Sequence, residues 1–272
     1  MAMKSLVVCA DDFAASEGIS QGIAELAGLG RISATSAMVL SPRWPQDALL
    51  LQDLRGRIDV GLHLDWTSAF AHAAGHGMSL SAALRKALFG GFGQAAVRAV
   101  IARQLDAFEL QWKAPPDHID GHQHVQQFSG IRQALVEIIR QRYGQARPWL
   151  RISRVPAVQA DFKSRFITAM GAAALRRLAA RTGMPCTTGL SGVYDFRGDA
   201  TRYAGLMAHW LQTSPEGGLL MCHPSSQSVA DDGPGPARSR EFDYLKSEEF
   251  LQALSHAQIR LVRGPRLPIS AT

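Results

Sequence analysis

The stretch SLVVCADD, residues 5–12, joins a mostly apolar run to two carboxylates. A short apolar run of this kind, without polar alternation, is typical of a strand buried on both faces of a parallel sheet. In parallel α/β folds the carboxyl ends of the strands gather on one side, and ligands bind there. The stretch therefore predicts the kind of sheet and the edge at which Asp11 and Asp12 lie.

The rest of the chain alternates short apolar runs with longer amphipathic stretches. Further strands are predicted at 33–40, 58–64, 149–155, 218–224 and 258–262, with 117–125 extended and 186–194 ambiguous. Helices are predicted at 16–29 with Ser16 as cap, 45–54, 80–112 divided at Gly90, Gly91 and Gly93, 131–143, 160–182, 201–212 and 244–257. Residues 225–240 are predicted to be a polar loop rich in glycine and proline.

This alternation implies parallel strands joined by right-handed crossovers. A doubly wound sheet and a closed (β/α) barrel both satisfy it, but no GxGxxG follows the first strand, so the dinucleotide-binding open sheet loses support. We therefore expect an α/β fold in which residues 1–272 form one catalytic domain. Its architecture is predicted to be a distorted (β/α) barrel, similar to a TIM barrel, with seven to eight parallel strands.

The composition is that of an ordinary globular protein, with 46% hydrophobic and 19% charged residues. The net charge of +6 is scattered along the chain without interleaved stacking aromatics, which argues against a nucleic-acid partner. No apolar stretch is long enough for a membrane span, and the apolar run near residue 5 is too short for a signal peptide. Cys9, Cys186 and Cys222 form no CxxC pair, which fits a cytoplasmic location.

Three later apolar runs also end in histidines, at His63, at His122 and His124, and at His223. Because the carboxyl ends of parallel strands converge, these side chains are expected to meet Asp11 and Asp12 in one cluster.

The segment DHIDGHQH, residues 117–124, is predicted to form one wall of that cluster. Side chains two apart share a face of a strand, so His118, Asp120, His122 and His124 would form one row if the strand continued. Neighbouring imidazoles in such a row lie about 7 Å apart, too far to hold one ion unless the backbone turns. We expect one of His122 and His124 to be a ligand and the other to reach toward substrate.

A carboxylate and two neutral imidazoles form a ligand set that leaves positions open for water and substrate. An ion held in this way lowers the pKa of bound water from 15.7 to roughly 7. A second carboxylate can take a proton, and a histidine across the pocket can donate one to a leaving amine. The residue types therefore predict metal-assisted hydrolysis, and hydrogen-bonded histidines that cap strands are the structural alternative.

Four segments resemble the signature segments of the YdjC-like carbohydrate deacetylases: ADDFAAS (10–16), VGLHLDWT (60–67), DHIDGHQHV (117–125) and LLMCHP (219–224). The resemblance implies a distorted (β/α) barrel that hydrolytically removes an acetyl group from an N-acetylated sugar, either an oligosaccharide or a glycolipid. It also implies one divalent ion, described as magnesium in this family.

By the same resemblance, Asp12, His63 and His122 hold the ion. Asp11 is the general base, and His223 faces the substrate as acid or oxyanion partner. His124 is either a substrate contact or the ligand in place of His122. Two imidazoles and one carboxylate suit Zn²⁺ or another transition metal better than Mg²⁺, which prefers oxygen ligands.

Two further residues are expected to contact the substrate. Arg154 would bind an anionic substituent of the sugar, and either Arg151 or Arg154 could pair bidentately with Asp11. Trp66 would stack on a sugar face or pack in the core.

The expected partner is the N-acetylated sugar or glycolipid, and a homodimer is left open. The alternatives are a related metal-dependent hydrolase of amides or phosphoesters, and a carbohydrate-binding barrel without catalysis.

Overall fold

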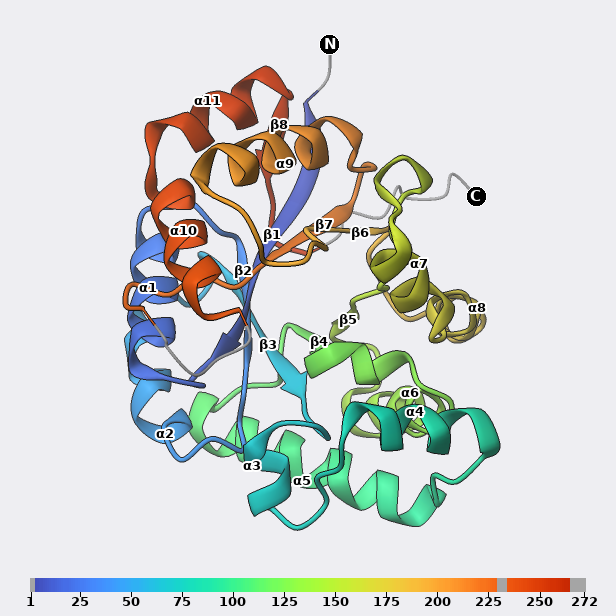
Figure 1. Ribbon diagram of the computed structural model, residues 1–272. Helices are drawn as coiled ribbons and strands as arrows, with labels where there is room; N and C mark the ends of the chain where they lie inside the picture. Colours follow the sequence, from blue (N-terminus) through green and yellow to red (C-terminus); the bar gives the residue numbers. More distant parts are fainter. Residues whose placement is uncertain (1–2, 229–233, 265–272) are drawn as a thin grey trace.

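The computed structural model describes residues 3–228 and 234–264, and parallel strands at its centre form a curled sheet (Figure 1). The order of the strands is β5-β4-β3-β2-β1-β7-β6, and β8 pairs with the first residues of β1. All of these pairings are parallel. The strands are β1 Lys4–Phe13, β2 Ala34–Ala37, β3 Asp59–Leu64, β4 His118–Gly121, β5 Trp149–Leu150, β6 Leu190–Ser191, β7 Gly218–Cys222 and β8 Ile259–Leu261.

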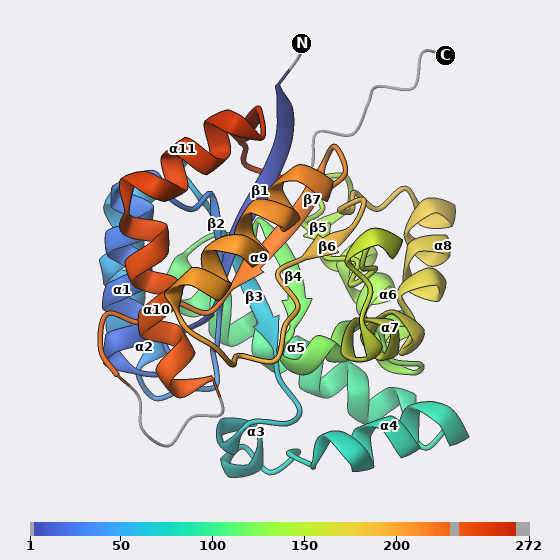
Figure 2. The same ribbon diagram turned by 45° about the horizontal axis from the view of Figure 1, so that its top comes forward.

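Helices surround this sheet on its outer side (Figure 2). They are α1 Glu17–Gly28, α2 Trp44–Asp47, α3 Ala69–Ala73, α4 Leu80–Phe89, α5 Gln94–Trp112, α6 Ile131–Tyr143, α7 Phe162–Ala169, α8 Ala172–Thr182, α9 Ala200–Thr213, α10 Gly235–Lys246 and α11 Glu248–His256. Short 3₁₀ helices lie at η1 Ala48–Leu54, η2 His122–Gln127 and η3 Ala157–Gln159. The predicted division of 80–112 and the predicted helix 131–143 are both confirmed.

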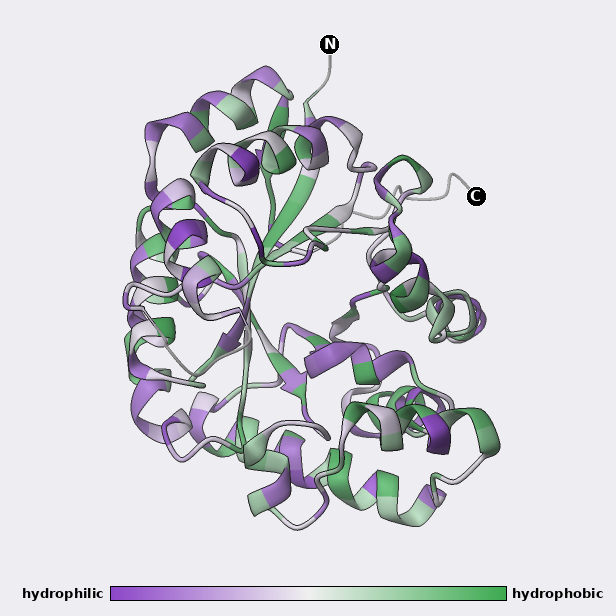
Figure 3. Cartoon of the chain, in the orientation of Figure 1, coloured by the Kyte–Doolittle hydropathy of each residue, from purple (hydrophilic) through white to green (hydrophobic). Residues whose placement is uncertain are grey.

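Side chains of β1 pack alternately on two hydrophobic clusters. Leu6 and Val8 belong to a cluster that includes residues of the surrounding helices, whereas Val7 and Cys9 belong to a second cluster with Leu219 of β7. The second cluster fills the inside of the curled sheet, and Figure 3 shows the apolar colour along the central strands. Burial on both faces explains why this strand has no polar alternation in its sequence.

The two ends of the strand series approach each other through irregular segments. Thr187 N donates to Leu150 O (3.0 Å) and Leu190 N donates to Arg154 O (2.8 Å), but no regular ladder joins β5 to β6. The sheet is therefore a curled, half-closed barrel, and the predicted distorted (β/α) barrel is confirmed. Within the described ranges, no helix combines the length and the hydropathy that a membrane crossing needs.

The predicted single helix over 160–182 is wrong. Helix α7 ends at Ala169 and α8 begins at Ala172, because Gly171 adopts φ +133°, which side-chain-bearing residues rarely adopt. A Cβ at Gly171 would lie 2.2 Å from Gln127 O, so the chain can pass here only with glycine.

Three further sequence predictions need correction. The predicted helix 244–257 is two helices, because Ser247 ends α10 and caps α11 by accepting a hydrogen bond from Phe250 N. Helix α10 also begins at Gly235, inside the predicted loop 225–240, and residues 229–233 of that loop lie outside the described residues. The predicted strand 149–155 pairs regularly only over Trp149–Leu150.

Replacement of Gly171 by alanine is expected to lower the free energy of unfolding by at least about 2 kcal/mol, because it adds backbone strain to a steric overlap. The matched control is Gly28→Ala, since Gly28 ends α1 with open space around it. That change is expected to shift stability by less than about 1 kcal/mol. Denaturant unfolding measures both, and equal effects would contradict the steric account.

Asp117 gives a pH-dependent prediction. Burial, together with Asp59, raises the pKa of Asp117 to about 6, so ionisation of this carboxyl disfavours the folded state. The cost is absent below about pH 4 and complete above about pH 6. Asp117→Asn keeps an oxygen for the hydrogen bond from Val60 N (2.9 Å). The variant should therefore gain stability over the unmodified protein as the pH rises from 4 to 7, measured by thermal unfolding; a constant difference would refute this.

Candidate active site

A pocket of about 580 Å³ lies at the carboxyl ends of β1, β3, β4 and β7. Carboxylates and imidazoles form part of its lining, and apolar side chains form much of the rest. The charged and imidazole side chains are Asp11, Asp12, His63, His122, His124, Lys163, His223 and Arg238; the apolar ones include Leu80, Phe166, Ile167, Met170, Phe196 and Met221. The predicted convergence of four distant segments is therefore present in the structure.

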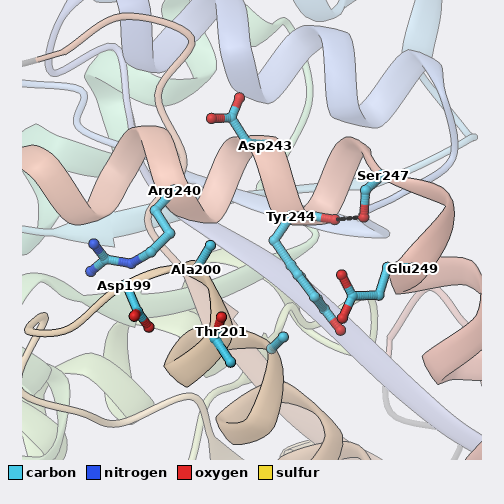
Figure 4. A pocket seen from close by; sticks show the side chains of 9 residues that line it. Asp199, Ala200, Thr201, Arg240, Asp243, Tyr244, Ser247 and Glu249 are labelled. Atoms are coloured by element: carbon cyan, nitrogen blue, oxygen red, sulfur yellow. Dashed lines mark hydrogen bonds between the residues drawn. The ribbon is translucent and has the colours of Figure 1, made fainter.

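A hollow of similar size, about 590 Å³, lies on the outer surface between α9, α10 and α11 (Figure 4). Its lining includes Asp199, Arg240 and Glu249, but no histidine and none of the predicted site residues. We therefore place the candidate site in the pocket inside the barrel and not in this hollow.

Asp11 lies at the end of β1 and is held by Arg151. The two guanidinium nitrogens of Arg151 donate to the two carboxylate oxygens of Asp11, both at 2.6 Å, so the predicted bidentate pair is formed by Arg151. Nη2 of Arg151 also lies 2.5 Å from Asp120 Oδ2. Burial raises the pKa of Asp11, but the charge and hydrogen bonds of Arg151, together with His63, hold this pKa below its usual range.

Asp12 points into the same pocket because the backbone changes direction there. The register of β1 against β2 shifts between Ala10 and Phe13, and Asp12 has φ +69°. Its Oδ2 accepts a hydrogen bond from Arg238 Nη2 (2.7 Å), whereas its buried Oδ1 has no hydrogen-bond partner within the described residues. Burial raises the pKa of Asp12, but Arg238 and His122 hold it well below its usual range.

His63, on β3, is oriented by a carboxylate behind it. Its Nδ1 lies 2.6 Å from Asp120 Oδ1, and its Nε2 lies 3.6 Å from Asp12 Oδ1. Burial lowers the pKa of His63, but Asp120, Asp11 and Asp12 together raise it to about 9. These carboxylates therefore favour positive charge at this place, whether it is carried by a proton or by a metal ion.

The row expected along 118–124 if the strand continued does not form beyond Asp120. Strand β4 ends at Gly121, and η2 follows with Gln123 and His124 at positive φ. This turn brings Nδ1 of His122 to 3.3 Å from Asp12 Oδ1 and directs His124 elsewhere. His122, and not His124, is therefore grouped with Asp12 and His63.

These three residues fit a metal ion. One donor atom from each of Asp12, His63 and His122 lies within 4.8 Å of the other two. The buried Asp12 Oδ1 lacks a hydrogen bond, which is costly unless a cation or proton donor satisfies it. Asp120 behind His63 is the kind of carboxylate that orients metal-binding imidazoles.

His223 and His124 occupy other parts of the pocket wall. Nε2 of His223 lies 4.0 Å from Asp11 Oδ2, so the predicted acid and base are close together. Nδ1 of His124 lies 3.0 Å from the Ser153 hydroxyl. Burial and Arg151 lower the pKa of His124 to about 3, so this imidazole is neutral at pH 7. A neutral imidazole has one nitrogen that donates and one that accepts a hydrogen bond, so it can bind a ligand in either way.

Two of the predicted substrate contacts are not placed at the pocket. Arg154 is exposed and lines a different hollow with Arg176 and Arg177. Trp66 is 2% exposed and contacts His76 edge to face, so its ring faces are covered by protein.

Several pocket residues were not found from the sequence. Arg238 lies in the segment that was predicted to be a loop, and Lys163 and Phe196 lie in segments without any recognisable motif. Asp120, which lies next to His63 and outside the lining, belongs to the row that the sequence predicts, but the sequence assigns it no role. A signal existed only for Asp120, as a carboxylate two residues before a candidate histidine ligand.

Comparison with known proteins gives consistent matches. The sequence model of a family described as YdjC-like protein matches residues 5–256. A chitooligosaccharide deacetylase of Serratia marcescens is 29% identical over 82% of this chain and 82% of its own length. One of Proteus mirabilis is 30% identical over 50% of this chain, so the aligned part spans only about half, 56%, of that protein.

Among solved structures, a protein of Enterococcus faecalis V583, described as a candidate cellobiose-phosphate cleavage protein, superposes with a TM-score of 0.69. The match covers 96% of this chain and 98% of that protein at 19% identity. At this identity the likeness concerns the fold, and it agrees with the curled barrel described above.

Removal of the carboxylate behind His63 is expected to weaken metal binding. Asp120→Asn should raise the dissociation constant for a divalent ion by about 10–100-fold, the usual effect of losing a partner that orients a ligand. His63→Ala should abolish tight binding, and His209→Ala, at an exposed position of α9, should not change it. Titration calorimetry with Zn²⁺ and Mg²⁺ measures the constants, and unchanged binding in His63→Ala would contradict the assignment.

Proposed function

Because the chain belongs to the YdjC-like protein family, we propose that it is a hydrolase that removes the acetyl group from an N-acetylated sugar. The names of its relatives from Serratia marcescens and Proteus mirabilis support carbohydrate deacetylation as the activity. The proposal takes the chain as one catalytic domain, with the pocket inside the barrel as its active site.

One observation carries this proposal: a potential three-residue metal site and a separate, ionised carboxylate share the same pocket. Asp12, His63 and His122 can hold an ion, and Asp11 lies beside them without belonging to their group. Amide hydrolysis requires a polarised carbonyl, a nucleophile and a proton donor for the amine, and this pocket has residues for each.

A divalent ion at Asp12, His63 and His122 would polarise the acetamide carbonyl and make water more acidic. Asp11 accepts the proton of the attacking water in this proposal. Arg151 keeps the Asp11 carboxylate ionised and fixes its plane through two hydrogen bonds of 2.6 Å. The same guanidinium also binds Asp120, and this second ion pair fixes the position from which Arg151 holds Asp11.

His223 donates the proton that the departing amine requires. Its Nε2 lies on the Asp11 side of the pocket, 4.0 Å from Oδ2, so a proton taken by Asp11 can reach the imidazole over a short path. His124, which is neutral at pH 7, is suited to a hydrogen bond with the acetyl group or a sugar hydroxyl. Apolar side chains of the lining, among them Phe166, Met170 and Phe196, would displace water from around a bound substrate.

The finer features are also proposals. Two imidazoles and a carboxylate favour Zn²⁺ or another transition metal, and Mg²⁺ is the alternative that the family resemblance implies. The substrate is an N-acetylated oligosaccharide or glycolipid, and the protein acts in the cytoplasm, as its unpaired cysteines suggest. Elemental analysis of the purified protein identifies the ion, and light scattering tests for a homodimer.

An acetate-release assay over N-acetylated oligosaccharides and glycolipids tests the activity. Release of acetate that stops with a chelator and returns with one divalent ion is the expected result. Release of phosphate or of another acid would indicate a related metal-dependent hydrolase. Sugar binding without any product would indicate a carbohydrate-binding barrel, and either of these results would overturn the proposal.

Asp11→Asn is expected to lower kcat by about 10²–10⁴-fold, which is the usual contribution of a general base. The bound metal should remain, because Asp11 is not in the proposed ligand group. Asp53→Asn, at an exposed position that is not part of the pocket lining, serves as control. Steady-state kinetics and metal content measure both effects; full activity in Asp11→Asn would rule out this residue as the base.

A further inference from the structure

The imidazole of His223 is not oriented through its second ring nitrogen. Its buried Nδ1 has no hydrogen-bond partner within the described residues, and the other nitrogen, Nε2, faces Asp11 at 4.0 Å. Histidines that transfer protons are commonly held by a carboxylate or carbonyl on the nitrogen that does not react. The position of this ring must therefore depend on another support.

Two side chains of α10 supply that support by binding the backbone N–H and the backbone carbonyl of His223. The N–H of His223 donates to Glu241 Oε2 (2.6 Å), and its carbonyl accepts from Arg238 Nη1 (3.3 Å). Strand β7 ends at Cys222, so this N–H lies beyond the last residue of the strand. Glu241 is 1% exposed and supplies the acceptor that a neighbouring strand would otherwise give.

The second oxygen of Glu241 helps to hold the aromatic residues that pack against the His223 imidazole. Glu241 Oε1 accepts a hydrogen bond from the Tyr194 hydroxyl (2.6 Å). The Tyr194 ring lies 4.8 Å from that of Phe196, and Phe196 in turn meets the His223 imidazole edge to face at 5.3 Å. One carboxylate thus controls both the backbone of His223 and the ring against which its imidazole packs.

The close approach of the Tyr194 segment to β7 depends on a glycine. Gly192 has φ +92°, and a Cβ there would lie 2.1 Å from Met221 O. Only glycine lets this segment approach β7 so closely, and so helps bring Tyr194 to Glu241.

From this geometry we propose that Glu241 is a positioning residue for His223, a role that rests on the proposed function of His223 as proton donor. Glu241 does not line the pocket and has no contact with the reacting atoms. It sets the place of the imidazole through the two hydrogen bonds that it accepts. Its effect is therefore on turnover and not on substrate binding.

Two variants of Glu241 and one control separate the reach of this side chain from its charge. Glu241→Asp keeps the charge but withdraws the carboxylate by about 1.5 Å, one C–C bond. Glu241→Gln keeps an oxygen for His223 N–H and offers an N–H₂ to the Tyr194 oxygen. Asp243→Asn is the control, because Asp243 is an exposed carboxylate on the same helix that projects away from its neighbours (Figure 4).

In the metal-loaded enzyme, Glu241→Asp should lower kcat by about 10–100-fold with KM changed less than about threefold, as expected when a reacting group is displaced by about 1 Å. Glu241→Gln should stay within about fivefold of the unmodified enzyme, and Asp243→Asn should match it. A folded Glu241→Asp with full kcat would overturn the inference. So would a folded Glu241→Gln that loses more than about tenfold, even if Glu241→Asp failed to fold.

Imidazole NMR gives a readout that does not depend on catalysis. The ring signals of His223, identified by their loss in His223→Gln, should move in Glu241→Asp and stay unchanged in Asp243→Asn. Unmoved signals in Glu241→Asp would overturn the inference. If the unmodified enzyme released no acetate, the proposed function would fail, and these spectra would still decide whether Glu241 positions His223.

Discussion

The buried ion pairs of Arg151 are the interaction on which the site depends. Its guanidinium is fully buried and binds Asp11 of β1 and Asp120 of β4, and Asp120 in turn holds His63 of β3. Charges removed from water are tolerated only when partners compensate them, and loss of one partner costs about 3–5 kcal/mol. The polar layer at this end of the barrel is therefore stable only as a whole. The four segments that carry Asp11, His63, Asp120 and Arg151 must come together before all of these charges are compensated.

Below this layer a histidine acts as a neutral packing element. His118 stacks on Trp149 with ring centroids 4.2 Å apart, and burial lowers its pKa to about 4. Its Nε2 lies 3.0 Å from the hydroxyl of Ser36, which donates to Asp120. A Cβ at Gly61 would lie 2.3 Å from this nitrogen, so a residue without a side chain on β3 provides the space. The inside of the barrel thus changes from apolar, through one neutral imidazole, to charged within a few residues of each strand.

Much of the fold could be predicted from the sequence, because buried strands and amphipathic helices have distinct periods. Helix 131–143 and the strand that ends in Asp11 and Asp12 follow from this pattern. The same rule explains why the polar cluster could be located, since parallel strands must end together. The rest depends on local backbone geometry. The turn after Gly121, which sends His122 and His124 in different directions, has no periodic signal, and neither has the break at Gly171. Arg238 and Glu241 lie on a helix whose glycine- and proline-rich start indicates a loop.

Strand β1 has three partners, and their places in the chain affect the order of assembly. Residues 9–13 pair with β2, about 25 residues later, whereas residues 4–10 pair with β7 and β8, more than 200 residues later. At about 5–20 residues per second, a ribosome makes β8 roughly 10–50 s after β1. During that interval β1, whose residues 6–10 are apolar and buried in the folded protein, has an open edge, which is a template for pairing with other chains. Nascent copies of this chain therefore need either dilution or a chaperone until the last strand emerges.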